Sequence, residues 1–385
     1  MRRPLPPKQT INSETHEFFI DPLKDLLPNV PEFISRGDRP LQMSFEDQLN
    51  ALIYFHLQEH TSARHLVQDL NDNDFARACI APDGGISRSS LSEILNARGL
   101  EPLQFVYREL YKKARKALPK EYAELGTLIS VYGTLIDAVL SMYWADYRKG
   151  SRKAKGHFGF NINQGIPARV FLTDGKGGER PFVSLILSPG QTGVMDRGYQ
   201  CHAAFDILQH EGKRFVCRIK VSTTKNVIKE NPVNPESFVF YDAEVLPGTP
   251  GVNQTERTVR VAGYEVEGVK YYVATDRRDL TAEQVATVYK LRWRIETFFK
   301  WWKKHLNVYH LIARSEYGLM VQIPGGLITY LLMAIYCRRQ FDENVSIRRI
   351  RELRTVILNE LYGSRHQSES AEKNFKKLNW SHAKT

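Results

Sequence analysis

The order of the elements predicted after Gly126 limits the fold more than any other feature of this chain. Residues before Leu118 have apolar positions at helical spacing, whereas strand-like segments follow Gly126. The strands are predicted at 128–131, 135–142, 157–163, 168–173 and 214–220, and residues 193–199 form a short strand that runs into a helix ending near His210. Consecutive strands with short links, then a strand–helix alternation and a long helix, indicate an α/β fold with a mixed sheet.

The boundaries of three regions follow from the same patterns. Residues 1–125 are predicted to form a helical N-terminal region, 126–335 the sheet-containing domain, and 336–385 a basic C-terminal helical region with a loose tail. Within the second region, residues from about 221 to 268 are punctuated by prolines and lack helical spacing, which predicts a β-rich insertion.

The N-terminal region contains short helices, a tight loop at 81–85 and a polar helix start. Ser62 and Ser87 are each placed to cap a helix, and the helix that follows Ser87 turns Arg88 outward near its beginning. This arrangement fits a helix-turn-helix DNA reader, and it fits an ordinary small helical bundle equally well.

A predicted helix from Thr281 to His305 carries four polar residues on one face, and Thr281 with Gln284 three residues later forms a capping-box pattern at its start. Tyr289, Arg292, Glu296 and Lys303 fall within about 60° of one another at 100° per residue. A glutamate can hold a divalent metal, an arginine and a lysine can grip phosphate oxygens, and a tyrosine can bond or stack beside them. An exposed face with an ion pair between Arg292 and Glu296 is an equally weighted alternative.

Two aspartates lie at or within apolar strands. Asp137 follows Leu135 and Ile136, and Asp196 ends a short apolar strand. A carboxylate in such a place is costly unless it is paired or bound to metal, so each one alone fits a salt bridge or a strand-end cap. Together with Glu296, the two aspartates could hold two Mg²⁺ ions for attack on a phosphodiester.

Five cations lie between the first of these strands and the next. They are Arg148, Lys149, Arg152, Lys153 and Lys155. Such a cluster attracts phosphates without reading bases, although a solvated hairpin tip is the alternative. The whole chain has a formal net charge of +11, which favours a polyanionic partner.

The chain has no sequence signal for secretion or a membrane. Its start lacks an apolar segment typical of a signal peptide, and the apolar run 323–337 is interrupted by Pro324 and two glycines. The four cysteines have no metal-binding spacing, which indicates a reduced, cytoplasmic protein without structural zinc.

At this point a family resemblance is evident. Asp137, Asp196-Arg-Gly-Tyr199 and Tyr289-x2-Arg292-x3-Glu296-x6-Lys303 resemble the signature of the insertion-sequence family four transposases, which are DDE transposases with a ribonuclease-H-like fold. Further matches are Lys155-Gly-His157 and Phe215-Val-x-Arg218. The resemblance covers about 130–335 and implies that the β-rich insertion belongs to the catalytic domain.

The resemblance also implies roles for residues. Asp137, Asp196 and Glu296 would be catalytic and would bind two ions of Mg²⁺ or Mn²⁺. The DNA contacts would come from Tyr289, Arg292, Lys303, Arg148, Lys149, Arg152, Lys153, Lys155, His157, Arg197 and Arg88.

The expected function is that of a DNA transposase. It would bind terminal inverted repeats, cleave double-stranded DNA at the element ends and join them to target DNA, most simply by cut-and-paste and as a homodimer on DNA. It would be a cytoplasmic, nucleoid-associated protein with no membrane partner. One alternative is a DNA-binding regulator without catalysis. Another is a different ribonuclease-H-like metal nuclease, which would cut without requiring the repeat.

Overall fold

A computed structural model of the chain describes residues 14–31, 42–138, 141–306 and 310–357. The chain divides into two compact units, one made of Met1–Leu118 with Trp302–Thr385 and the other of Pro119–Trp301. The boundary at Trp301 falls inside the region 126–335 that is predicted to form one domain. The first unit is therefore built from two separate segments of the chain.

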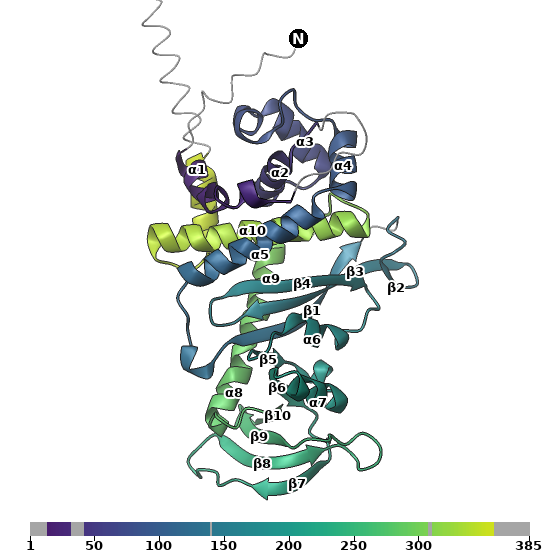
Figure 1. The fold of residues 1–385 in the computed structure, drawn as a ribbon, viewed down its shortest axis with the longest axis vertical. Helices are drawn as coiled ribbons and strands as arrows, with labels where there is room; N and C mark the ends of the chain where they lie inside the picture. Colours follow the sequence, from purple (N-terminus) through teal and green to yellow (C-terminus); the bar gives the residue numbers. More distant parts are fainter. Residues whose placement is uncertain (1–13, 32–41, 139–140, 307–309, 358–385) are drawn as a thin grey trace, which may run out of the picture. The chain divides into compact units, whose positions relative to one another are not determined.

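The first unit is helical (Figure 1). Its helices are α1 (Glu14–Ile20), α2 (Phe45–Leu57), α3 (Ala63–Asp72), α4 (Arg88–Ala97), α5 (Leu100–Ala117), α10 (Glu316–Phe341) and a helix over 347–357, with shorter turns at Asp21–Leu23, Leu27–Asn29 and Ala76–Ile80. The hydroxyls of Ser62 and Ser87 accept hydrogen bonds from backbone amides in the first turns of α3 and α4. These two predicted helix caps are confirmed.

Helix α10 is the apolar centre of this unit. By length and composition it could cross a membrane, but 89% of its most apolar stretch is buried inside the structure. Gly325 and Gly326 lie directly against Leu52 and His56 of α2, where a side chain would meet them at 3.1 Å. The helix continues through Pro324, because close packing against α2 stabilises a helix that proline alone would break.

The second unit contains the sheet. Its strands are β1 (Leu128–Ala138), β2 (Asp146–Arg148), β3 (Ser151–Asn161), β4 (Ile166–Asp174), β5 (Thr192–Met195), β6 (Arg214–Ile219), β7 (Lys225–Glu230), β8 (Val239–Pro247), β9 (Val259–Val266) and β10 (Val269–Thr275). Its helices are α6 (Pro181–Ile186), α7 (His202–His210), α8 (Ala282–Leu291) and α9 (Trp293–His305), with short turns at Ala123–Leu125 and Arg197–Tyr199; α9 continues past Trp301 into the first unit.

The strand order confirms the predicted mixed sheet. It runs β2-β3-β1-β5-β6-β10-β9-β8-β7, with β4 also paired to β3. Strand β1 pairs antiparallel with β3 and parallel with β5, and β5 pairs parallel with β6. This arrangement is consistent with a ribonuclease-H-like fold. The β-rich insertion supplies β7, β8 and β9, which extend the same sheet rather than forming a separate one.

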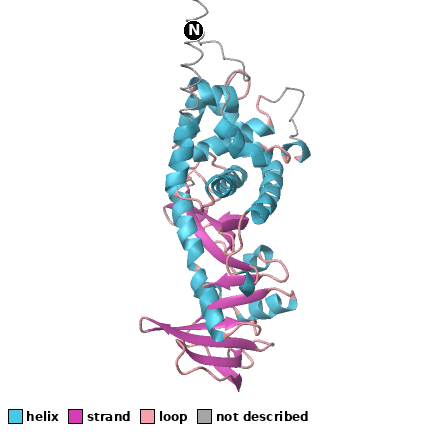
Figure 2. Ribbon diagram, turned by 90° about the vertical axis from the view of Figure 1, so that its left-hand side faces the viewer, coloured by secondary structure: helices cyan, strands magenta, loops and turns pink. Residues whose placement is uncertain are grey.

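Helices cover both faces of the sheet (Figure 2). On one face, Ile129 and Val131 of β1 and Met195 of β5 share a buried apolar cluster with Val183 of α6 and Phe205 of α7. On the other face, the aromatic side chains of α9 contact the sheet: Phe299 lies against Tyr132 and Phe158, and Phe298 against Phe160. Because side chains alternate along a strand, odd-numbered residues of β1 face α6 and even-numbered residues face α9.

Candidate active site

Asp196 lies at the carboxyl end of a buried parallel strand. All four residues of β5 are buried, and the aspartate that follows them is exposed. Its carboxylate accepts a hydrogen bond of 2.7 Å from the amide of Gly198 and caps the turn Arg197–Tyr199. A buried strand thus holds an exposed carboxylate in a fixed place, on the α9 face because Val194 and Asp196 share one parity.

Glu296 is carried by α9 and is already paired. Arg292 Nη1 lies 2.6 Å from Glu296 Oε1, and the side chains are 9% and 30% exposed. The Arg292 guanidinium also lies over the rings of Tyr289 and Trp293. The ion pair considered from the sequence therefore exists. It leaves the second carboxylate oxygen of Glu296 for another cation.

Asp137 does not join these two carboxylates. It shares the parity of Val131 and so faces α6, on the opposite side of the sheet from α9. Its carboxylate is ion-paired with Lys153, directly across in the register of β1 and β3. The expected convergence of Asp137 with Asp196 and Glu296 is thus not found in this structure, because the register of the sheet puts Asp137 on the other face.

The predicted DNA-contacting cations fall into two groups. Arg148, Lys149, Arg197 and Arg88 are exposed. By contrast, Arg152 is paired with Asp146, Lys153 with Asp137, and Lys155 donates to the carbonyl of Gly177 and lies 3.5 Å from Glu179. The basic segment is mostly strand and not loop, since β3 begins at Ser151 and contains Arg152, Lys153 and Lys155.

The remaining predicted contacts lie on the two helices. Tyr289, near the end of α8, is buried, and its pKa is raised chiefly by burial. Lys303 lies on α9, half-buried, in the part of that helix that belongs to the first unit.

His157 is part of the core and not of the surface. It is 1% exposed, its ring stacks on Phe182 of α6 at 4.0 Å, and its Nε2 lies 2.9 Å from the Thr173 hydroxyl. A direct DNA contact from His157 does not fit this placement, because α6 covers it. The sequence pattern Lys155-Gly-His157 does not reveal which face the histidine takes.

Burial of His157 predicts a pH-dependent stability. Burial is the main cause that lowers its pKa from 6.5 to about 4. Between these values the unfolded chain binds more protons than the folded one, so the free energy of unfolding should fall as the pH drops through this window. We expect His157→Gln to lose less stability than the wild type between about pH 7 and pH 5 in urea titrations. His310→Gln, at an exposed histidine, is the matched control; equal slopes for all three proteins would contradict this assignment.

Sequence reasoning missed two residues beside the site, Glu179 and Tyr132. Glu179 lies against Gly133, where any side chain would collide with its carboxylate, and it is among the charges that raise the pKa of Tyr199. Tyr132 is half-buried, and its pKa is raised by burial and next by the negative charge of Glu296. Neither residue lies in a motif that its local sequence would single out.

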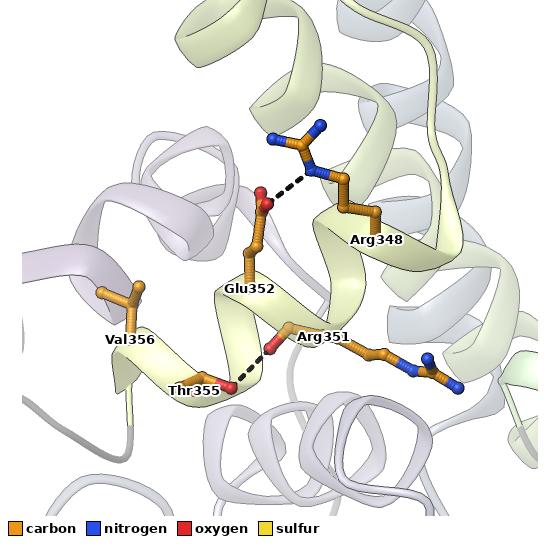
Figure 3. A pocket seen from close by; sticks show the side chains of 5 residues that line it. All are labelled: Arg348, Arg351, Glu352, Thr355 and Val356. Atoms are coloured by element: carbon orange, nitrogen blue, oxygen red, sulfur yellow. Dashed lines mark hydrogen bonds and ion pairs between the residues drawn. The ribbon is translucent and has the colours of Figure 1, made fainter.

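Two polar features occur in the helical unit. His60, His65 and Asp69 have ligand atoms within 4.8 Å of one another, although His60 Nε2 and Asp69 already form a 2.9 Å hydrogen bond. A surface pocket lies on the helix over 347–357 and is lined by Arg348, Arg351, Glu352, Thr355 and Val356 (Figure 3). Arg348 is paired there with Glu352 at 2.7 Å. Both features belong to a different unit from Asp196 and Glu296.

Comparison with known proteins adds a family match. The family model described as a transposase DDE domain matches residues 126–332. A probable transposase for insertion sequence element IS5377 from Geobacillus stearothermophilus is 28% identical over 207 residues, which cover 53% of this chain and 55% of that protein. A protein from Synechocystis sp., named as a transposase for insertion sequence element IS4SA, is 26% identical over 245 residues, 60% of this chain and 67% of that protein. In the first of these matches the chain spans little more than half the length of its relative.

Proposed function

Since the chain belongs to the transposase DDE domain family, we propose that it is a DNA transposase that binds the terminal inverted repeats of an insertion sequence and cleaves and joins DNA strands at the element ends. The observation that carries this proposal is that two carboxylates lie on one face of the sheet. Asp196 ends β5, and Glu296 is presented by α9, which covers the same face. Excision by cut-and-paste and a homodimer on DNA belong to the proposal, as does a cytoplasmic place of action.

The two carboxylates could hold one divalent metal ion but not two. Asp196 and Glu296 provide carboxylate oxygens, which Mg²⁺ and Mn²⁺ prefer, and an ion held there would polarise a phosphodiester and activate a hydroxyl for attack. Two carboxylates suit a single ion that completes its coordination with water and phosphate. The two ions implied by the family resemblance would need a third carboxylate, and Asp137 is directed away from this face.

The basic residues would hold the DNA backbone. Arg148 ends β2 and Lys149 follows it at the exposed turn to β3, and Arg197 follows Asp196 directly. Arg292 and Lys303 would add phosphate contacts along α8 and α9, beside Tyr289. Contacts of this kind position a duplex without reading its sequence, so recognition of the repeat is assigned to the helical N-terminal region with Arg88.

The placement of Asp137 also favours a second candidate function, DNA binding without catalysis. Such a protein would bind the same ends and fail to nick them. A nicking and strand-transfer assay with Mg²⁺ or Mn²⁺, on one DNA that contains the repeat and one in which it is scrambled, separates the candidates. A transposase requires the repeat and joins strands; cutting of both DNAs without joining would contradict it and indicate a different nuclease.

The exposed turn gives a direct test of DNA contact. The double variant Arg148→Ala/Lys149→Ala should bind end-containing DNA more weakly, and the slope of log K against log salt should become shallower by about 2, because each lost phosphate contact removes about 0.9. Gel shifts at several salt concentrations measure both quantities.

The control for this test is Arg214→Ala. Arg214 starts β6 and is paired with Asp279 at 3.0 Å, at the end of the parallel strands away from Asp196. Its loss removes one surface cation and should leave the slope unchanged. If the control and the double variant give the same slope, the turn does not contact the DNA.

A further inference from the structure

The residue level with Asp196 on the neighbouring strand is Tyr132. In the parallel pairing of β1 and β5, Leu128, Ile129 and Ser130 lie beside Thr192, Gly193 and Val194. Two residues further along, the same register sets Tyr132 beside Asp196. Asp137 comes five residues later, which is about 16 Å further along the strand at 3.3 Å per residue.

Tyr132 also faces Glu296. It belongs to the even-numbered residues of β1, and its ring stacks on Phe299 of α9 with centroids 5.2 Å apart and planes 21° apart. Phe299 lies one turn after Glu296 on the same helix. Burial is the main cause that raises the pKa of Tyr132, and the negative charge of Glu296 is the next. Tyr132 therefore lies on the face shared by Asp196 and Glu296, and it lies level with the first of them.

Two other carboxylates near β1 are on the wrong side. Asp137 pairs with Lys153 on the α6 face. Glu179 lies against the Cα of Gly133, also on that face, and interacts with Lys155 at 3.5 Å. Both carboxylates already interact with lysines of β3, and Asp137 is the only acidic residue of β1, so β1 offers no acidic ligand on the α9 face.

A tyrosine is a poor substitute for such a ligand. Mg²⁺ and Mn²⁺ bind carboxylate and carbonyl oxygens, whereas the phenol of a tyrosine is neutral at physiological pH and contributes no charge. One of the two negative charges that remain, Glu296, is already balanced by Arg292. The site consequently has little net negative charge to attract a divalent cation.

We propose that Tyr132 occupies the position of the third metal-binding carboxylate, so that this chain binds divalent metal weakly at Asp196 and Glu296, and that Tyr132→Asp completes the site. The inference rests on the proposed function, since it assigns the metal to that same site. It adds that DNA cleavage by the chain in its present form is weak, and that the residue at position 132 accounts for this.

The test is a Mn²⁺ titration by calorimetry on the full-length protein. Tyr132→Asp should bind Mn²⁺ at least about tenfold more tightly than the wild type, since even outer-shell changes alter metal affinity by 10–100-fold. The matched control is Tyr132→Asn, which has nearly the shape of aspartate, loses the same ring packing on Phe299 and adds no charge. It should bind Mn²⁺ no better than the wild type.

Three outcomes would overturn the inference. They are equal affinity of the aspartate and asparagine variants, retention of the gain when Glu296→Gln is added to Tyr132→Asp, and tight binding of two Mn²⁺ ions by the wild type. The last measurement needs no variant, so it stands even if the substitutions unfold the protein.

Gel shifts with end-containing DNA are run beside the titrations. If the wild-type protein does not bind end-containing DNA, the proposed function is contradicted. Intact end binding with no gain of Mn²⁺ affinity would contradict only the assignment of Tyr132.

Discussion

Replacing Asp242 with alanine is expected to lower the free energy of unfolding of the sheet-containing unit by about 3–5 kcal/mol, the typical cost of leaving one member of a buried ion pair alone. Asp242 of β8 and Arg260 of β9 are 6% and 8% exposed. Arg260 donates to both oxygens of Asp242, at 2.8 and 2.7 Å, in a bidentate pair. Without this carboxylate, the Arg260 guanidinium would remain in the core and lose its bidentate partner.

The same pair connects the insertion to the helix that leads to the candidate site. Arg260 also donates to the carbonyl of Leu280, one residue before Thr281, which caps α8. Loss of Asp242 should therefore loosen the start of α8 as well as the sheet. Urea denaturation followed by circular dichroism measures the change in stability.

Glu244→Ala is the control for Asp242→Ala. Glu244 lies on the same strand and pairs with Arg278 at 2.8 Å, but the arginine side chain is 46% exposed. Because the arginine of this pair is exposed to water and the glutamate side chain is 18% exposed, the pair contributes about 1 kcal/mol, so this variant should lose much less stability than Asp242→Ala. Similar losses for both variants would mean that burial does not determine the cost.

The second large effect is expected from Glu296→Gln. Glutamine keeps the size of the side chain and can still accept a hydrogen bond from Arg292, but it removes the charge that a metal requires. We expect metal-dependent cleavage of end-containing DNA to fall by at least about a hundredfold, because even outer-shell partners of a metal change activity by 10–100-fold. End binding in gel shifts should change little, since the exposed cations at Arg148 and Lys149 are untouched.

The cleavage assay is best carried out in two backgrounds. Wild-type cleavage is expected to be weak if Tyr132 occupies a ligand position, so Tyr132→Asp supplies the stronger signal in which to measure the effect of Glu296→Gln. Cleavage that persists at full rate after Glu296→Gln in both backgrounds would rule out a role for this carboxylate. Loss of folding would identify Glu296 chiefly as the structural partner of Arg292.

Local signals in the sequence predicted local structure well. Thr281 and Gln284 form the expected capping box, with each side chain accepting from the backbone amide of the other residue. The caps at Ser62 and Ser87 were also predictable, because each serine accepts a hydrogen bond from the backbone amide three residues later. The order of strands and helices was likewise sufficient to predict a mixed sheet.

Features set by distant partners were not predictable. The apolar run around Asp137 is predicted to be a second strand, whereas residues 128–138 form one strand. The orientation of this strand's two faces depends on its pairing with β5, which lies far along the chain. The expected single helix from Thr281 to His305 is divided at Arg292. The amide of Arg292 donates to the carbonyl of Tyr289, and the amide of Ile295 donates to the carbonyl of Arg292. This is a tighter i→i+3 pattern, which the helix-forming composition of the segment does not reveal.

The discontinuity of the helical unit has a consequence for biosynthesis. Its central helix, α10, begins at Glu316, whereas the helices that pack on it, α2, α4 and α5, are complete by Ala117. At 5–20 residues per second, a ribosome needs about 10–40 seconds to translate the chain between them. During that time the faces of the early helices that pack on α10 lack this native partner, while the sheet can already pair within itself. The N-terminal region therefore depends on the last part of the chain to be translated, and a truncated product would leave it without its core.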